Sequence, residues 1–341
     1  MKRKLTMPPF VSMIVPCYNE EATILQLLDA VLAQTYPQSQ MEIIIADAFS
    51  QDQTRERINM FQRDHDSLSL RVVDNERHII PAALNLAIRE SRGEIIVRLD
   101  AHSQPNPEYV ARCVQALEEG KGANVGGVWE ILPGGKGWMA ESIAAAASHP
   151  LGVGDAMYRL NPKAGAVDTV PFGAFRRELV EQIGGFDETL LTNEDYEFNT
   201  RVRRSGGVVW LDPQIRSIYF ARASLFELAR QYGRYGFWKW KMLKRYTSTL
   251  RWRQALPPLF TASLIVLAVL SVWFSSARWF LSIEIILYLL VLIAASVQTA
   301  IRNHKPFLIV GLPLSILIMH LSWGSGFLFS LILSPLNQNH G

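Results

Sequence analysis

Hydrophobic and polar positions along the first 120 residues follow two alternating patterns. Short apolar runs with the length of buried strands occur at 10–15, 42–46, 68–73 and 94–99. Apolar residues recur at helical spacing between and after these runs, at 20–35, 52–63, 81–91 and 107–117. Such strand–helix alternation predicts an α/β fold with a doubly wound, mostly parallel sheet and right-handed crossovers.

The last third of the chain has a different pattern, because it is almost continuously apolar. Three stretches are long enough to cross a bilayer, at about 256–274, 277–300 and 307–333. Aromatic residues mixed with lysine and arginine precede them and predict an interfacial amphipathic helix. We therefore expect a soluble domain over 1–222, an interfacial segment over 223–253 and a membrane domain over 254–335.

Basic residues around these stretches predict an orientation. Six precede the first span: Lys239, Lys241, Lys244, Arg245, Arg251 and Arg253. The first connection holds only Arg278, whereas the second holds Arg302 and Lys305. The positive-inside rule then predicts a multi-pass protein of the inner (plasma) membrane, with a cytoplasmic soluble domain and an external C-terminus. The basic opening, 1–5, lacks the apolar length of a signal peptide.

Composition excludes several classes of protein. The formal net charge is only +3, and no basic stripe is interleaved with stacking aromatic residues in the first half of the chain, so we expect no nucleic-acid partner. The two cysteines, Cys17 and Cys113, lie far apart in the chain, which argues against a disulfide framework and a cysteine-rich zinc site. This usage fits a reducing compartment.

Polar clusters follow three of the predicted strands, and ligands of such sheets bind at the carboxyl ends of the strands. One cluster contains Asp100 and His102. In an extended chain these two side chains point the same way, so they could share a divalent cation, Mn²⁺ or Mg²⁺, with diphosphate oxygens completing the shell. The alternative is that Asp100 caps a turn and His102 is solvated. Arg98 is expected to point to the opposite face and to be structural only.

Five stretches resemble, in order, the inverting GT-A-fold glycosyltransferases of family 2, which use nucleotide sugars. They read "VSMIVPCYNEE", "EIIIADAFSQDQT", "IVRLDAH", "IGGFDETLLTNEDYEFNTRVRRSGG" and "QYGRYGFWK". The Asp-Ala-His triplet and the three C-terminal spans most resemble the succinoglycan-type exopolysaccharide glucosyltransferases.

For the nucleotide, the resemblance implies that Pro16, Tyr18 and Glu20 line the base and ribose pocket. It also implies that Asp47 accepts a hydrogen bond from uracil. Two positions depart from the family pattern, since Ala48 replaces its second aspartate and Phe49 replaces its glycine.

For the chemistry, the resemblance implies that Asp195 is the catalytic base and that Glu194 positions the acceptor. Without the resemblance, the same stretch is a capped amphipathic helix with acidic residues in its first turn.

Four further residues are assigned through the resemblance. Gln231 and Arg234, three residues apart on one helix face, are expected to reach the donor diphosphate. Gly173 and Tyr235, the latter in place of the family's tryptophan, are expected near the acceptor.

These observations favour an enzyme that transfers glucose from UDP-glucose to a polyprenyl-linked saccharide at the membrane lipid surface. One alternative is transfer to polyprenyl phosphate itself. Another is an inactive nucleotide-binding partner of a membrane assembly. Glu284 and His320 fall within the predicted spans, and their role stays open.

Overall fold

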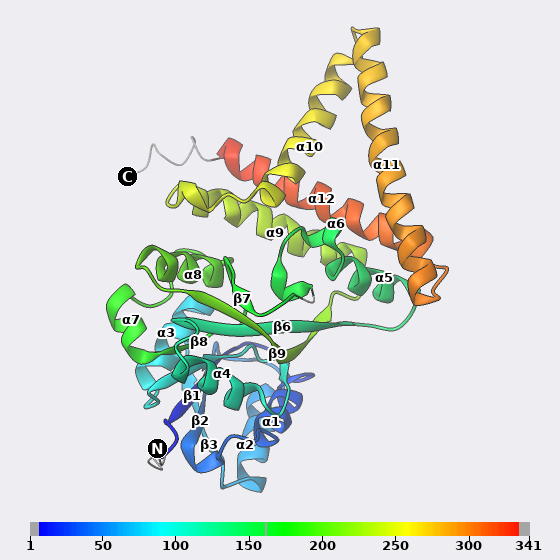
Figure 1. The fold of residues 1–341 in the computed structure, drawn as a ribbon. Helices are drawn as coiled ribbons and strands as arrows, with labels where there is room; N and C mark the ends of the chain where they lie inside the picture. Colours follow the sequence, from blue (N-terminus) through cyan, green and yellow to red (C-terminus); the bar gives the residue numbers. More distant parts are fainter. Residues whose placement is uncertain (1–6, 161, 334–341) are drawn as a thin grey trace. The chain divides into compact units, whose positions relative to one another are not determined.

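A computed structural model describes residues 7–160 and 162–333, and it divides the chain into two units (Figure 1). The first unit comprises 7–130 and 162–219. The second comprises 131–160 and 220–333. The basic opening of the chain and its C-terminal end lie outside the described residues, so the expectations for them stay predictions.

The first half of the sheet is parallel, as predicted. Its strands are β1 (Val11–Cys17), β2 (Met41–Asp47), β3 (Ser69–Asp74) and β4 (Ile95–Arg98), in the spatial order β3-β2-β1-β4. The helices between them are α1 (Ile24–Leu32), α2 (Thr54–Asp64) and α3 (Ile80–Glu90). Helix α3 packs on β1 and β2, while α1 and α2 pack together. Isoleucine and valine fill both faces of β1 and β2, as expected for strands covered on each side.

Antiparallel strands extend this half into a mixed nine-stranded sheet. They are β5 (Gln104–Pro105), β6 (Asn124–Pro133), β7 (Gly165–Ala166), β8 (Ala174–Arg176) and β9 (Val209–Ala221). The order continues β4-β8-β6-β9-β5, with β7 paired to β9. The helices here are α4 (Tyr109–Glu118), α7 (Arg177–Ile183) and α8 (Glu194–Arg204). Short 3₁₀ turns occur at Gln38–Gln40, Met157–Arg159 and Thr247–Thr249.

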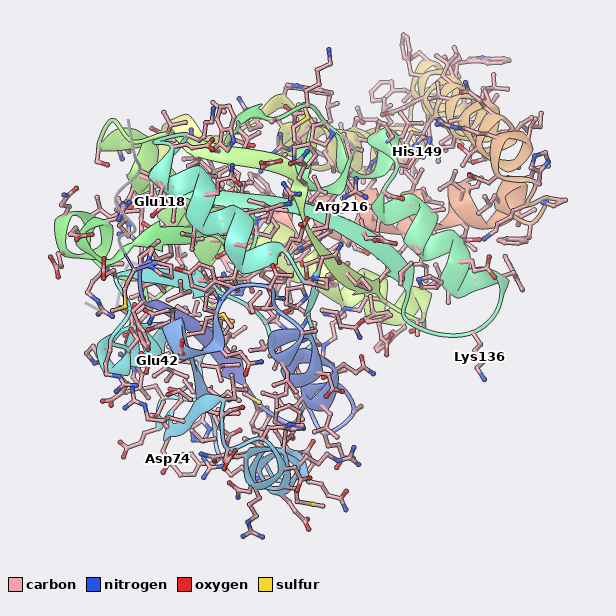
Figure 2. All side chains as sticks on the ribbon, turned by 60° about the horizontal axis from the view of Figure 1, so that its bottom comes forward. Glu42, Asp74, Glu118, Lys136, His149 and Arg216 are labelled. Carbon is pink, nitrogen blue, oxygen red and sulfur yellow. The ribbon has the colours of Figure 1, made fainter. Side chains whose placement is uncertain are left out.

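Acidic residues lie at both ends of the parallel strands, but the one at the amino end has a structural role. Glu42 lies near the amino end of β2, whereas Asp74 ends β3 at the carboxyl edge (Figure 2). The Glu42 carboxylate is buried and accepts hydrogen bonds from Ser12 Oγ at 2.7 Å and from the backbone N–H of Arg92 at 2.6 Å. Burial alone would raise the pKa of Glu42, but these bonds and the Arg92 guanidinium lower it below its usual value. Glu42 is therefore a structural carboxylate.

The second unit contains three helices long and apolar enough to cross a membrane, and they match the three predicted stretches. They are α10 (Trp252–Leu270), α11 (Ser275–Asn303) and α12 (Leu308–Leu333). Helices α10 and α11 form a helical hairpin (Figure 1). Large apolar side chains such as Phe280 and Leu290 are exposed on α11, which suits a lipid-facing surface.

The predicted amphipathic helix is α9 (Leu225–Leu243), and it packs closely along α12. Glycines permit this approach. A Cβ atom at Gly236 would lie 2.1 Å from the carbonyl oxygen of Trp323, and one at Gly326 would lie 2.1 Å from that of Gly233. Small residues at helix contacts are typical of membrane proteins.

The segment 131–160 belongs to the second unit, whereas the sequence placed it within a continuous domain, 1–222. It forms α5 (Trp138–Ala147) and α6 (Pro150–Val153), which pack on α12. His320 on α12 lies 2.9 Å from the Leu151 carbonyl oxygen through Nε2 and 2.9 Å from the Tyr288 hydroxyl through Nδ1. An alanine-rich helix carries small side chains that allow close packing on α12, which explains the association physically.

Candidate active site

Two turns at the carboxyl ends of β1 and β2 are hydrogen-bonded to each other. The backbone N–H of Asn19 donates to Ser50 Oγ at 2.8 Å, and that of Gln51 donates to Asn19 Oδ1 at 2.8 Å. Tyr18 and Phe49 project from these turns, with exposed fractions of 50% and 42%. The sheet therefore presents two aromatic rings at the edge where ligands of such folds bind.

Phe49 has a φ of 57°, in the left-handed region that normally favours glycine. The resembled family pattern has glycine at this position, and glycine adopts a positive φ without strain. The centroid of the Phe49 ring lies 5.4 Å from the guanidinium carbon of Arg55 and 5.6 Å from the centroid of the His78 ring. A bulky residue held in this strained conformation suggests a use for its ring.

Asp47 ends β2 and is fully buried. Its carboxylate accepts from the backbone N–H of Ser50 at 3.0 Å and from the Arg55 guanidinium, which also pairs with Asp74. These bonds hold the shape of the turn that carries Phe49. The predicted contact of Asp47 with uracil stays a prediction, and Pro16 lies one residue before the end of β1.

The Asp-Ala-His triplet is a turn, so the expectation of an extended stretch was wrong. The backbone N–H of Ser103 donates to the carbonyl oxygen of Asp100 at 2.9 Å, and Ser103 Oγ also donates to it at 2.7 Å. The chain reverses here because it has passed the end of β4. The His102 ring instead contacts Glu20, with Nδ1 3.0 Å from Oε1. Glu20, expected in the nucleotide pocket, thus links the β1 turn to the triplet.

Two carboxylates open helix α8. Asn193 occupies the N-cap position with a left-handed φ of 69°, and Glu194 and Asp195 follow in the first turn. The positive end of a helix dipole favours negative charge at this place. Both carboxylates bond to Arg98, which lies on β4 and is distant in sequence. The fold thus brings the predicted base beside the end of the central strand.

Arg98 corrects the sequence analysis, which expected its side chain on the opposite face. The guanidinium bonds to Asp195 through Nη1, and through Nη2 to Glu194 at 2.9 Å and to Asp100 at 3.2 Å. Residues two apart along an extended chain share a face, so the Arg98 guanidinium can reach Asp100 as well as the two carboxylates of α8. Burial opposes the charge on Arg98, but Asp100 and Glu194 outweigh it and raise the pKa of the guanidinium.

Comparisons with known proteins identify the family to which the chain belongs. The family model for glycosyl transferase family 2 matches residues 12–184, which includes the β1 turn, the β2 turn and the Asp-Ala-His triplet. The chain belongs to glycosyl transferase family 2.

Named members of the family resemble this chain over almost its whole length. A dolichyl N-acetyl-α-D-glucosaminyl phosphate 3-β-D-2,3-diacetamido-2,3-dideoxy-β-D-glucuronosyltransferase of Methanococcus voltae is 26% identical, covering 95% of this chain and 97% of the relative. The succinoglycan biosynthesis protein ExoA of Rhizobium meliloti is also 26% identical, covering 92% of each chain.

A solved structure supports the GT-A fold. The mannosyltransferase PcManGT from Pyrobaculum calidifontis, determined with GDP-Man and Mn²⁺, aligns with a TM-score of 0.65 and 22% identity. The alignment covers 96% of this chain and 88% of that one. The predicted fold class and family are therefore confirmed, including the three apolar C-terminal helices.

The donor atoms of this family 2 site suit a divalent cation. Within 7–160 and 162–333, no group of three His, Cys, Asp or Glu residues has the geometry of a metal site. Asp100 and His102 can supply a carboxylate oxygen and an imidazole nitrogen, and ligating histidines commonly pair their other nitrogen with a carboxylate, as Nδ1 pairs with Glu20. Phosphate oxygens and water would have to complete the shell.

The remaining predicted residues lie in two places. Gly173 lies beside β4, where its carbonyl oxygen accepts the backbone N–H of Arg98 at 3.0 Å. Gln231, Arg234 and Tyr235 lie on α9 in the second unit, and Gln231 Nε2 donates to the Tyr235 hydroxyl at 2.9 Å. Their contacts with donor and acceptor stay predictions.

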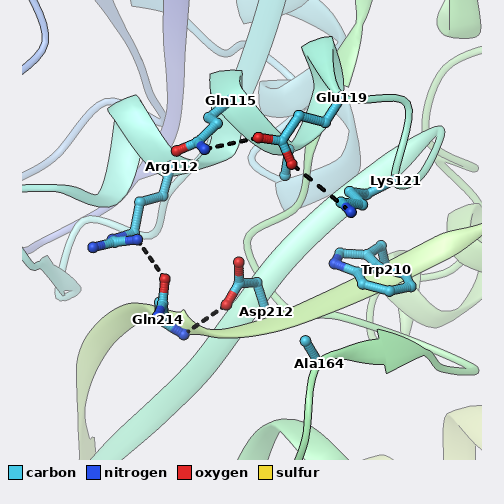
Figure 3. A pocket seen from close by; sticks show the side chains of 9 residues that line it. Arg112, Gln115, Glu119, Lys121, Ala164, Trp210, Asp212 and Gln214 are labelled. Carbon is cyan, nitrogen blue, oxygen red and sulfur yellow. Dashed lines mark hydrogen bonds and ion pairs between the residues drawn. The ribbon is translucent and has the colours of Figure 1, made fainter.

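A hollow of about 240 Å³ lies elsewhere in the first unit, against the end of α4 and the start of β9. Its wall includes Trp210, Asp212 and Arg112, and hydrogen bonds and ion pairs join many of its polar side chains to one another (Figure 3). None of the predicted site residues lines it. The candidate site lies instead at the carboxyl ends of β1, β2 and β4.

Proposed function

We propose that this protein is a membrane-anchored inverting glycosyltransferase that transfers glucose from UDP-glucose to a polyprenyl-linked saccharide, in exopolysaccharide or cell-envelope glycan synthesis. The observation that carries the proposal is the convergence of Asp100, Glu194 and Asp195 on Arg98, beside the turns that carry Tyr18 and Phe49. The names of the relatives support a lipid-linked substrate and a role in exopolysaccharide synthesis.

Asp195 is the proposed general base. It takes the proton of the acceptor hydroxyl while that oxygen attacks the anomeric carbon of the donor sugar. The bond from this carbon to the diphosphate oxygen breaks in the same step, so UDP leaves and the configuration inverts. Glu194, fixed by the same guanidinium, holds a second hydroxyl of the acceptor.

Residues of the two turns bind the donor in this proposal. Tyr18 and Phe49 hold the base, Pro16 shapes the pocket wall, and Asp47 maintains the turn and accepts from uracil. A divalent cation held by Asp100 and His102 would neutralise the negative charge that develops on the departing diphosphate. Gln231 and Arg234 are proposed to contact that diphosphate, and Gly173 and Tyr235 to border the acceptor.

The proposed location is the inner (plasma) membrane, with the glycosyltransferase domain in the cytoplasm. The basic residues before α10 and between α11 and α12 support it through the positive-inside rule. This orientation gives the enzyme access both to cytoplasmic nucleotide sugars and to the headgroups of polyprenyl lipids.

The test uses membranes that contain the protein, incubated with radiolabelled UDP-glucose and extracted polyprenyl-linked saccharides. GDP-mannose and UDP-N-acetylglucosamine serve as competing donors. Metal-dependent label in a lipid-linked saccharide supports the proposal. Label on polyprenyl phosphate alone would identify the simpler acceptor, and UDP binding without any transfer would identify an inactive partner.

A further inference from the structure

We propose that Arg98 is a positioning residue for transfer, because its one guanidinium sets the spacing between the catalytic base and the donor-side carboxylate. This inference rests on the proposed function, since it assigns Asp195 to the acceptor and Asp100 to the donor. It adds a structural link between the acceptor side and the donor side of the site, which neither Asp195 nor Asp100 provides alone.

The geometry of the bonds carries the inference. Nη1 of Arg98 bonds to Asp195, while Nη2 bonds to Asp100 Oδ1 at 3.2 Å and to Glu194 Oε1 at 2.9 Å. Asp100 lies two residues after the end of β4, whereas the other two carboxylates begin α8. A planar guanidinium presents its N–H groups at fixed angles, so it holds these groups from two separate elements in one relative placement.

Arg98 is itself held firmly. Only 3% of the residue is exposed, and its guanidinium carbon lies 5.9 Å from the centroid of the Phe186 ring. Its backbone N–H donates to Gly173 at 3.0 Å, and a Cβ atom at Gly173 would lie 2.2 Å from Asn124 Oδ1. The glycine thus allows the residue before β8 to lie close to Asn124 on β6 while its carbonyl oxygen binds the end of β4. A buried side chain on a central strand is a rigid support for the carboxylates.

The charges give a second reason for the arginine. Three carboxylates surround one guanidinium, so removal of Arg98 would leave mutual repulsion between Asp100, Glu194 and Asp195 without any compensating charge from this group. Lysine would restore one positive charge, but a single ammonium lacks the forked geometry that binds several carboxylates at set angles. Misplacement of a reacting group by about 1 Å can reduce a rate about 100-fold.

The experiment measures transfer by Arg98→Lys and Arg98→Ala in full-length protein in membranes, with UDP-dependent thermal stabilisation as the readout of folding and nucleotide binding. Arg177→Lys is the matched control, because Arg177 donates to the carbonyl oxygens of Gly93 at 2.9 Å and Ser91 at 2.8 Å and is not part of the proposed machinery. We expect kcat to fall at least 50-fold in Arg98→Lys, with KM for UDP-glucose within about 3-fold of wild type and Arg177→Lys within about 3-fold in kcat.

Chemical rescue separates positioning from a merely structural role. Millimolar guanidinium should raise the rate of Arg98→Ala at least 5-fold, whereas equal sodium chloride should not. Near-wild-type kcat in Arg98→Lys would overturn the inference, and so would a failure of guanidinium to rescue an Arg98→Ala protein that UDP still stabilises. If Arg98→Ala does not bind UDP, the test rests on the kcat of Arg98→Lys: the expected fall supports the inference, and a near-wild-type value overturns it. A wild-type protein without transfer would instead contradict the proposed function.

Discussion

Glu20 and His102 are joined by a contact between Oε1 and Nδ1 at 3.0 Å, which links the turn after β1 to the turn after β4. A carboxylate in this position fixes the orientation of an imidazole and increases its basicity toward a metal. The residue expected to contact the nucleotide therefore has a second role in our account, as the support of a metal ligand.

Glu20→Gln should raise the Mn²⁺ concentration required for half-maximal transfer about 10- to 100-fold, which is the usual cost of losing such a support. His102→Ala should raise it further, with a smaller effect on the donor KM at saturating metal. The measurement is initial rate against Mn²⁺ and Mg²⁺ concentration. Glu21→Gln is the control, because the Glu21 carboxylate accepts a hydrogen bond from the backbone N–H of Gln53 at 3.0 Å and is not part of the proposed site. Unchanged metal dependence in both His102 and Glu20 variants would remove His102 from the metal shell.

Phe49→Asn should weaken UDP binding about 10-fold, since stacking of a base on an aromatic ring contributes roughly 1–3 kcal/mol. Asparagine tolerates a left-handed φ, so the turn should keep its shape and the effect should come from loss of the ring. Phe49→Tyr, which retains a ring, is the control. Binding is measured by calorimetry with UDP. Equal affinity in the asparagine variant and the wild type would show that the ring does not contact the base.

Gly236→Ala should destabilise the membrane unit, because its Cβ would lie 2.1 Å from the Trp323 carbonyl oxygen and force α9 away from α12. Gly233→Ala is a matched control three residues away, where the Cβ atom would lie at an ordinary distance of 3.7 Å from the Ser322 carbonyl oxygen. Thermal denaturation of the detergent-solubilised protein should show a drop of several degrees for the first variant only. Similar melting temperatures for both variants would mean that these helices do not pack as described.

Glu42 predicts a pH dependence of stability. Its pKa is lower in the folded protein than in the unfolded chain, so its contribution is present above the unfolded value of about 4.3 and is lost as pH falls through the folded value. Glu42→Gln should therefore lower the free energy of unfolding by about 2 kcal/mol at pH 7, and the difference from wild type should shrink below pH 4. Glu90→Gln, at an exposed position, is the control. A difference that stays constant down to pH 3 would contradict the assignment.

The parallel strands and their helices were predictable because long β-branched runs between helical patterns have one common arrangement. Strands such as β5 and β7 have only two residues, so no periodic pattern could reveal them. Helix α5 is short and alanine-rich, and its composition is compatible with a soluble domain as well as with a membrane bundle. Its place beside α12 depends on tertiary packing, which the local sequence does not encode.

For the candidate site, the sequence pointed to carboxylates but not to the arginine that joins them. The order of motifs singled out Asp100 and Asp195, and their roles stay predictions, whereas Arg98 was expected to be structural. Two signals were present in the sequence. Arg98 lies two positions before Asp100, and an arginine at the end of a buried strand needs a partner for its charge. What the sequence could not show is that α8 would provide the other two carboxylates.

Asp195→Asn tests the central claim most directly, in a single-turnover measurement of transfer from UDP-glucose. The amide preserves shape but cannot accept the proton, so the rate should fall about 100- to 10,000-fold while UDP still stabilises the protein. Asp212→Asn, at the rim of the separate hollow, should transfer at the wild-type rate. A transfer rate for Asp195→Asn within a few-fold of wild type would contradict the assignment of Asp195 as the base.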